Sequence, residues 1–449
     1  MGEQQLARPP GPRNWPGLGA SLDFQRDNLG AMVRYAKTYG DLTYFRVPGA
    51  DIYIATHPDD IAAVLVGEHS RYMKDQLLHE VDRFVGRGLL TSEGSFWRRQ
   101  RRTVAPVFQR RHIERFAATM ARRARQCADT MCTGAPAARD VHADMMVVTL
   151  QIVLDTMFGS YALPDIDAVG DMVEAMLSEF QRTMMTWRRV LPRAFNRRSY
   201  DRMNGAVAAM DTLLYGLIAE RRDGGEEADD LLGRLLAARD DEGRGMSDRQ
   251  IRDEVATVFL AGHETTALVL SYALYLLARH PKIGARLEAE VDAVLGDRDA
   301  TVEDIADLPF TEAIVRETMR LYPPAYTVGR EALEPCTLRG FPIPRGAQVL
   351  TPTWVVHRDP RWWDDAERFA PERWLDGLAS RLHRFAYFPF GGGPRICVGN
   401  HFAMQEGIIV LAGLAQRLRV TPDPDFTLEL STSVTLRPKA GVRVRVAAR

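Results

Sequence analysis

One cysteine lies in a glycine-rich loop whose residue types suit a reactive or metal-binding thiolate. The segment Phe390–Gly399 reads FGGGPRICVG, and it leads into a predicted helix that begins near Asn400. Backbone N–H groups aimed at the sulfur of Cys397 and the positive end of a helix both lower the pKa of a thiol. Consecutive glycines let the backbone approach the sulfur closely. Arg395, two residues earlier, can pair with a carboxylate.

A second set of polar residues interrupts the centre of a long apolar helix. Ser247 and Gln250 form a possible capping box and Pro281 ends the pattern, which predicts a helix of roughly 33 residues, about 50 Å long. A helix of that length must cross a domain, so its centre is expected to be buried. That centre reads AGHETT, Ala261–Thr266, where a glycine, a carboxylate and two threonines contradict helix propensity. Such a conflict at a buried place indicates function, and Thr265 can bond back to a carbonyl and open the helix to water.

Further charged residues fall at spacings that suit ion pairs or carboxylate binding. Glu317 and Arg320 lie one turn apart on an apolar helix, and Arg373 lies shortly before the cysteine loop. Trp97 and Arg101 lie four residues apart, so an indole N–H and a guanidinium can donate to one carboxylate. Taken alone, these charges also suit a solvated surface.

In their order along the chain, these motifs resemble the signature of the cytochrome P450 family, of the soluble bacterial type without a fused reductase. The resemblance covers nearly the whole chain and implies a haem b cofactor, with Cys397 as the axial thiolate ligand of the iron. It also implies propionate contacts, a structural triad, an oxygen groove and an acid–alcohol pair for proton delivery. The residues are Trp97, Arg101, Arg330, Phe390 and Arg395 for haem binding, with Lys74 a weaker candidate; Glu317, Arg320 and Arg373 for the triad; Ala261 and Gly262 for the groove; and Glu264 and Thr265 for catalysis. His263 is expected to fill space rather than to bind metal.

The elements that must position these residues are mainly helices. Helical patterns occupy roughly 100–132, 140–158, 166–188, 201–222, 282–295, 310–321 and 399–417, whereas strand patterns gather at about 43–56, 327–356 and 418–447. The sequence therefore predicts an α+β, mainly helical fold with a long central helix and small segregated β-sheets. We expect one P450-type domain over residues 1–449, with 1–22 as a Pro-rich entry segment. No strand pattern precedes a Gly-x-Gly-x-x-Gly motif, so no Rossmann dinucleotide site is predicted.

Composition places the chain among globular enzymes. Apolar residues make up 46% of the 449 residues, and the net charge of −1 gives no reason to expect a nucleic-acid or membrane-surface partner. Four cysteines in so long a chain suit a reducing compartment rather than a disulfide framework. Residues 1–22 have no apolar core of signal-peptide or membrane-span length. A soluble, cytoplasmic monomer is expected.

The resemblance implies a monooxygenase that inserts one oxygen atom from O2 into a C–H bond of a lipophilic small molecule. The expected substrate is a terpene such as a sesquiterpene, with a fatty acid or steroid as alternatives. No flavin or iron–sulfur segment is evident, so both electrons are expected from a ferredoxin, or alternatively a flavodoxin, served by an NAD(P)H reductase. A basic stripe that would steer an acidic partner comprises Arg98, Arg99, Arg102, Arg110 and Arg111.

Two other functions are compatible with a haem-thiolate protein. One is a peroxide-driven peroxygenase or an isomerase, whose members usually lack the acid–alcohol pair. The other is a haem sensor without turnover, which has no use for a proton relay. The presence of Glu264 and Thr265 favours the monooxygenase.

Overall fold

The computed structural model describes residues 8–15, 18–132, 137–159, 196–223 and 230–449, together with residues 170, 172, 175, 176, 178, 179 and 182. Contacts within the chain divide it into two compact units, which are described separately below. The first unit comprises Met1–Glu80, Met319–Cys397 and Val434–Leu436. The second comprises Val81–Thr318, Val398–Ser433 and Arg437–Arg449.

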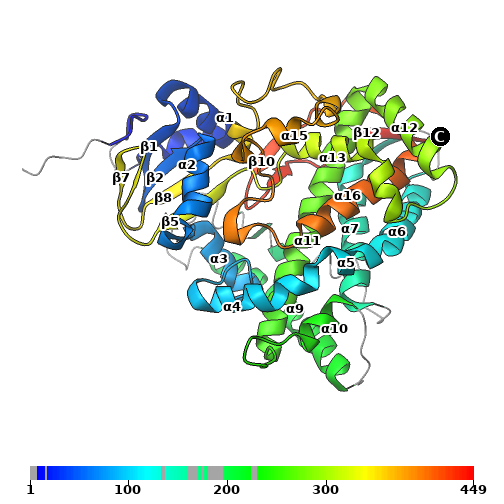
Figure 1. The fold of residues 1–449 in the computed structure, drawn as a ribbon, viewed down its shortest axis with the longest axis horizontal. Coiled ribbons are helices and arrows are strands. Elements are labelled where there is room, and N and C mark those ends of the chain that lie inside the picture. Colours follow the sequence, from blue (N-terminus) through cyan, green and yellow to red (C-terminus); the bar gives the residue numbers. More distant parts are fainter. Residues whose placement is uncertain are drawn as a thin grey trace, which may run out of the picture. The chain divides into compact units, whose positions relative to one another are not determined.

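A five-stranded sheet organises the first unit (Figure 1). Its order is β1 (Leu42–Val47), β2 (Ala50–Ala55), β8 (Gln348–Thr351), β5 (Val328–Ala332) and β3 (Tyr72–Lys74). β2 and β8 pair in parallel, and the other neighbours are antiparallel. Strands β6 (Cys336–Leu338) and β7 (Phe341–Ile343) form a separate hairpin. The unit also contains α1 (Ser21–Tyr39), α2 (Pro58–Ala62), α14 (Thr353–Val356), α15 (Leu378–Arg381), the π-helix η1 (Ala63–Gly67) and the 3₁₀ helices η2 (His69–Arg71), η8 (Pro371–Trp374), η9 (Arg384–Ala386) and η10 (Gly393–Arg395).

The core of the first unit joins this sheet to the segment that precedes the cysteine loop. Tyr53 of β2 and Val349 of β8 belong to one apolar cluster with Leu65 of η1 and with Phe385 and Phe388. Burying the two phenylalanines removes a large apolar area from water. The base of the loop is therefore fixed by ordinary hydrophobic packing.

The second unit is built around the long helix α11 (Asp248–Arg279). The predicted start is confirmed, because the Ser247 side chain accepts from the backbone of Gln250, whose side chain bonds back to Ser247. The predicted end is also confirmed, since the helix stops at Arg279 before Pro281. Helices α7 (Val141–Phe158) and α16 (Asn400–Ala415) lie alongside α11 (Figure 1).

The second unit contains further helices and strands. The helices are α3 (Gln76–Val85, which begins in the first unit), α4 (Gly94–Val104), α5 (Arg110–Ile113), α6 (Ala117–Met131), α9 (Arg197–Asp223), α10 (Leu231–Ala237), α12 (Pro281–Leu295) and α13 (Pro309–Leu321, which ends in the first unit), with the 3₁₀ helices η3 (Ala105–Phe108), η4 (Glu114–Phe116) and η7 (Glu303–Asp307). β12 (Arg443–Ala448) pairs with β4 (Ala137–Asp140) and β9 (Leu418–Pro422). β10 (Leu430–Thr432) pairs with β11 (Leu436–Pro438).

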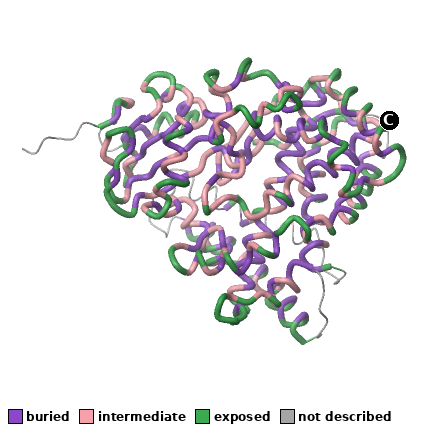
Figure 2. Tube along the Cα trace, viewed as in Figure 1, coloured by how far each residue is buried: buried purple, intermediate pink, exposed green. Residues whose placement is uncertain are grey.

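The centre of the second unit is apolar and buried, as the purple stretches along its helices in Figure 2 show. Among the described residues, α7 is the one helix apolar and long enough to cross a membrane, but most of it is buried inside the protein. Its hydrophobicity is therefore that of a core helix packed against α11.

The predicted α+β, mainly helical fold is confirmed. One predicted helix is wrong: the stretch 100–132 breaks after Val104, where Pro106 lies in the 3₁₀ helix η3, because proline has no N–H and its ring clashes with a continuing α-helix. Helix α1 was not predicted. The predicted helix at 166–188 lies largely outside the described residues, as do residues 1–7 and 16–17 of the Pro-rich entry.

Candidate haem-thiolate and oxygen-activation site

The cysteine loop is a compact turn that exposes Cys397. The amide of Cys397 donates a hydrogen bond to the carbonyl oxygen of Phe390 at 3.0 Å, and the amide of Ile396 donates to that of Gly393 at 3.1 Å. Cys397 is exposed and is in no disulfide, whereas the other three cysteines are buried or half-buried. It is the one of the four cysteines that falls in the exposed class.

Two of the loop glycines are required by close packing within the first unit. Gly393 has a φ of +69°, and a Cβ atom there would lie 1.9 Å from the carbonyl oxygen of Leu65 in η1. A Cβ at Gly392 would lie 2.4 Å from the ring of Phe385. We expected these glycines to let the backbone approach the sulfur. The structure shows that they let the loop seat against η1 and the aromatic core, which fixes where Cys397 lies.

Buried His357 makes a hydrogen bond to the segment just before the loop. Its Nε2 accepts a hydrogen bond from the amide of Phe388 at 3.0 Å, two residues before Phe390. Burial, and after it the nearby charge of Arg320, lower the pKa of His357 to about 3. The imidazole is therefore neutral and keeps a lone pair for the amide. Sequence reasoning did not single out His357.

The two arginines of the predicted triad organise backbone carbonyls in the first unit. Arg320 is fully buried, and its guanidinium donates to the carbonyl oxygens of His357 at 2.9 Å, Ala366 at 2.6 Å and Arg368 at 3.0 Å. Arg373 donates to the carbonyl oxygen of Asp364 at 3.0 Å. The third member, Glu317, is also fully buried, one turn before Arg320 on α13. Glu317 and Arg320 are thus buried and Arg373 is half-buried, and the joint role of the three as a triad stays a prediction.

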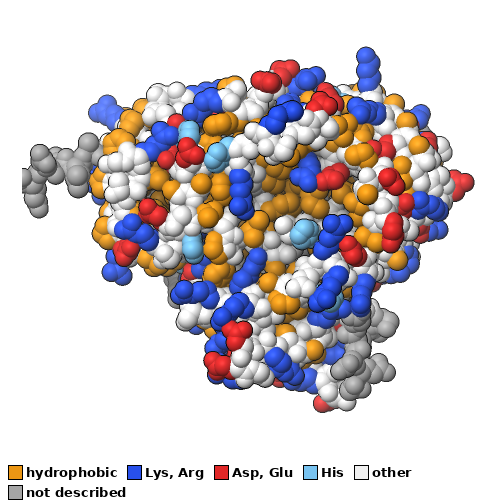
Figure 3. All heavy atoms as spheres, viewed as in Figure 1, with side chains coloured by type: hydrophobic (Ala, Val, Ile, Leu, Met, Phe, Trp, Pro, Cys, Tyr) orange, Lys and Arg blue, Asp and Glu red, His pale blue; other side chains and the backbone are white. Residues whose placement is uncertain are grey.

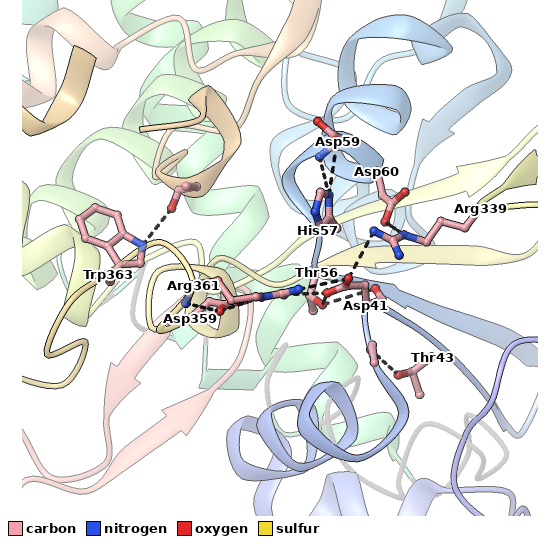
Figure 4. A network of polar contacts seen from close by, with 12 residues as sticks. Asp41, Thr43, Thr56, His57, Asp59, Asp60, Arg339, Asp359, Arg361 and Trp363 are labelled. Carbon is pink, nitrogen blue, oxygen red and sulfur yellow. Dashed lines mark hydrogen bonds and ion pairs between the residues drawn. The ribbon is translucent and has the colours of Figure 1, made fainter. Parts of the chain in front are cut away.

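A more exposed ion network holds the elements around η1 (Figure 4). Arg361 bonds to Asp41 at 2.7 Å and to Asp359 at 2.6 Å, while Arg339 bonds to Asp60 of α2 at 2.5 Å. Figure 4 shows these side chains converging from strands and turns that are distant in sequence. Because α2 runs directly into η1, the network helps to fix the Leu65 carbonyl against which Gly393 packs.

Two buried cations lie opposite each other in the five-stranded sheet. Lys74 of β3 and Arg330 of β5 are register partners, and each is 6% exposed. Like charges directly opposite are destabilising unless an anion is near. Burial raises the pKa of the neighbouring Asp75, although Arg330 acts in the opposite direction. Buried lysine and arginine side chains are of the kind that binds a carboxylate.

In the second unit, α11 is buried along its length except for one face near its middle. Between Ile251 and Leu274, the residues that are not buried are Val258, Ala261, Gly262 and Thr265. Their spacing of i, i+3, i+4 and i+7 places them on a single helical stripe. Three of them belong to the predicted groove and acid–alcohol pair. Val258 was missed, although its spacing from Ala261 could have identified it.

The two threonines of the motif bond back to the helix as expected. Thr265 Oγ donates to the carbonyl oxygen of Ala261 at 2.7 Å, and Thr266 Oγ donates to that of Gly262 at 3.3 Å. The helix nevertheless continues without interruption, so the expected opening of its hydrogen-bond ladder is not seen. A Cβ at Gly262 would lie 3.3 Å from Val153 of α7. Helix packing is therefore one reason for the glycine at this position.

The acidic member of the motif is held by an arginine from the C-terminal strands. Glu264 is buried, and its Oε1 lies 2.5 Å from Nε of Arg437 in β11. The two side chains are 4% and 13% exposed, so this pair is largely shielded from solvent. The adjacent His263 is buried and its Nδ1 bonds to the carbonyl oxygen of Phe259 at 2.8 Å, in agreement with a packing role. No local pattern in the sequence indicated that Arg437 would reach Glu264.

Helix α4, which carries Trp97 and Arg101, is tied to α11. Gln100 donates to the Glu254 carboxylate of α11 at 3.2 Å, and the amide of Leu89 donates to the same group at 3.0 Å. Trp97 is buried and Arg101 is half-buried. The Gln100–Glu254 contact, which sequence reasoning missed, thus fixes the helix that presents both predicted propionate ligands.

Most arginines of the basic stripe are exposed, while its role in docking a partner stays a prediction. Arg98, Arg102, Arg110 and Arg111 are exposed, and Figure 3 shows cationic side chains over α4 and α5. Part of the charge is neutralised, because Arg102 pairs with Asp241 at 2.8 Å and Arg110 pairs with Glu114 at 2.9 Å.

Comparison with known proteins decides the family. The cytochrome P450 family model matches residues 9–444. The chain belongs to the cytochrome P450 family. It is 33% identical to cyclooctatin synthase of Streptomyces melanosporofaciens, over 94% of this chain and 93% of that protein. It is 30% identical to pentalenene oxygenase of Streptomyces avermitilis, over 97% of this chain and 96% of that protein. The crystal structure of the cytochrome P450DA heme domain matches with a TM-score of 0.89 and 27% identity, over 99% of this chain and 98% of that one.

As a cytochrome P450, the protein is a haem monooxygenase with cysteine thiolate ligation, and it needs an electron-transfer partner. The residues of the structure fit a haem. The exposed thiol of Cys397 can supply the thiolate, and the buried cations Lys74 and Arg330 suit a carboxylate such as a propionate.

Proposed function

We propose that this P450 hydroxylates a terpene, with Cys397 as the axial ligand of haem b. When bound, the haem supplies the reduction of O2 and the insertion of oxygen into a C–H bond. Trp97, Arg101, Arg330 and Arg395 would bind the propionates, and Phe390 would pack beside the thiolate. The match of the family model to residues 9–444 supports our expectation of one P450 domain over the whole chain.

The observation that carries this proposal is the accessible stripe on α11. Val258, Ala261 and Gly262 present a small, apolar surface, and Thr265 adds a single hydroxyl. Apolar contact with little hydrogen bonding suits a lipophilic substrate, whereas the hydroxyl suits proton delivery.

Thr265 and Glu264 would move protons to this face. Thr265 Oγ already donates to the carbonyl oxygen of Ala261, so its lone pairs are available to accept a proton. Glu264 would take a proton at a carboxylate oxygen and pass it to Thr265 Oγ, whose own proton would move into the groove. Arg437 acts as a positioning residue, because its ion pair fixes the Glu264 carboxylate when the acid is ionised.

The substrate class is supported by the relatives. Terpene oxidases appear among the similar proteins at about the 30% level, including pentalenene oxygenase and cyclooctat-9-en-7-ol 5-monooxygenase. We therefore place a terpene, such as a sesquiterpene, before a fatty acid or steroid.

An acidic ferredoxin, or in second place a flavodoxin, would deliver electrons from NAD(P)H at the stripe of Arg98, Arg102, Arg110 and Arg111. The bacterial relatives support a cytoplasmic location, and the monomeric state and the absence of a fused reductase are further parts of this proposal.

The proposal is tested with the holoenzyme. The ferrous–CO complex of the wild-type protein should show the strongly red-shifted Soret band of a thiolate ligand, and Cys397→Ser should abolish it. Cys127→Ala, Cys132→Ala and Cys336→Ala are matched controls that should keep it. A Cys397→Ser variant that retained the band would show that another residue binds the iron.

A difference-spectrum screen of terpenes, fatty acids and steroids, followed by turnover under isotope-labelled O2, tests the reaction. Label in the product with consumption of NADPH supports the monooxygenase. Turnover with hydrogen peroxide alone would indicate a peroxygenase, and haem binding without any product would indicate a sensor.

A further inference from the structure

A buried carboxyl group lies in α16 and takes no part in the proton route described above. Glu406 is 0% exposed in the interior of the second unit, where α16 lies against α11 (Figure 1). Both of its carboxyl oxygens are buried and have no hydrogen-bond partner among the described residues. Burying a polar group without partners is unfavourable, and burying an ionised one is more so.

The environment of Glu406 favours the neutral acid. Burial raises the pKa of Glu406 to about 8, and the side chain of Thr266 is the one group of the described protein that opposes this rise. Within the described part of the chain no cation compensates a carboxylate here, unlike at Glu264, where Arg437 lies 2.5 Å away. At neutral pH, Glu406 therefore carries a proton.

Thr266 connects this acid to the accessible face of α11. Its hydroxyl donates to the carbonyl oxygen of Gly262 at 3.3 Å, and it lies close enough to Glu406 to stabilise the ionised carboxyl group. A threonine hydroxyl has one proton to donate and two lone pairs with which to accept. The Glu406 O–H can therefore donate to Thr266 Oγ while Thr266 donates toward Gly262, which lies on the accessible stripe. Glu406, Thr266 and the Gly262 carbonyl form a polar line from the core to the groove.

We propose that Glu406 stores a proton for oxygen activation and releases it through Thr266, on a route separate from Glu264 and Thr265. The Glu406 O–H bond breaks as Thr266 Oγ gains that proton, and the original Thr266 proton passes to a water molecule at the Gly262 carbonyl. Reduction of O2 consumes the proton, and Glu406 regains one by the reverse transfers after that water has taken a proton from bulk solvent. Monooxygenation consumes two protons per turnover, so two separate proton donors could each supply one of them. This inference rests on the proposed function and deepens it.

The first test measures the protonation state of the Glu406 carboxyl group directly. Infrared difference spectra of the holoenzyme in H2O and D2O should show the C=O stretch of a protonated carboxylic acid at neutral pH. Glu406→Gln should remove that band, whereas Glu429→Gln, which changes an exposed carboxylate paired with Lys439, should keep it. A band unchanged in Glu406→Gln would overturn the proposal. This readout needs neither substrate nor turnover, so it fails or succeeds independently of the proposed function.

The second test reads proton delivery during turnover with NADPH, a ferredoxin and its reductase. Pentalenene is the probe. We expect product per electron pair to fall roughly 3- to 10-fold in Glu406→Gln, less than the ~10²–10⁴ typical of general acid catalysis because the Glu264 route persists. Thr266→Val should give the same loss, Thr266→Ser should restore most of the yield, and the double variant should be no worse than either single one.

Wild-type yield in Glu406→Gln, or additive losses in the double variant, would refute the relay and leave a structural role. If the wild-type protein does not oxidise pentalenene, that terpene is not its substrate. The same variants are then compared without substrate, by measuring how much of the consumed O2 becomes peroxide and how much becomes water.

Discussion

Glu406 should make the stability of the folded protein depend on pH. In the unfolded chain this carboxyl loses its proton near its ordinary pKa of 4.5, but in the folded protein burial holds the pKa at about 8. Between these values unfolding releases a proton, so rising pH favours the unfolded chain. The folded protein should therefore lose stability as pH rises from 4.5 to about 8, and this contribution should be constant above and below that window.

The size of the effect follows from the shift. One pKa unit corresponds to about 1.4 kcal/mol, so the free energy of unfolding should fall by about 1.4 kcal/mol for each pH unit within the window. Between pH 5.5 and 7.5 that amounts to about 3 kcal/mol, a large share of the ~5–15 kcal/mol that stabilises a domain. Glu406→Gln has the shape of the protonated acid but no titration. Its stability relative to the wild type should rise by this amount over the same interval.

Urea unfolding followed by circular dichroism at pH 5.5, 6.5 and 7.5 measures the difference. Glu429→Gln, on the surface, should follow the wild type and shows what a generic loss of one negative charge does. If Glu406→Gln and the wild type change in parallel with pH, Glu406 is ionised in the folded protein and the reasoning from burial is wrong.

Three further predictions concern the site and its partner. Thr265→Ala should keep haem content and substrate binding but divert electrons to peroxide, because the hydroxyl on the accessible face of α11 is lost; full coupling of NADPH to product would contradict the assignment. Gly393→Ala should lower the thermal midpoint and haem retention more than Gly340→Ala does. Both change a glycine of positive φ, at a strain of about 1–2 kcal/mol, but a Cβ meets nothing within 4 Å at Gly340 and lies 1.9 Å from the Leu65 carbonyl oxygen at Gly393. Equal losses would show that the contact with η1 is unimportant. Arg98→Glu with Arg102→Glu should slow reduction by ferredoxin and flatten its salt dependence while dithionite reduction is unchanged; a native rate at low salt would place the docking surface elsewhere.

Features that depend on residues close together in the chain could be predicted from the sequence. The start of α11 is set by Ser247 and Gln250, three residues apart, and its end by Pro281, so both follow from local hydrogen bonding and sterics. The back-bond of Thr265 to Ala261 is likewise a contact within one helical turn. The loop around Cys397 combines glycines, an arginine and a cysteine in so short a segment that its chemistry was evident before any fold was known.

Which distant groups these residues meet is a property of the folded chain. Arg437 and Glu264 form an ion pair although they are 173 residues apart in the sequence. The amide of Phe388 bonds to His357, which is 31 residues away. The Leu65 carbonyl explains Gly393, and the packing of α16 against α11 buries Glu406 beside Thr266. An arginine in a strand or a glutamate in an apolar helix has no local pattern that names its partner. The free energy of such contacts depends on burial, and burial is set by how remote segments pack.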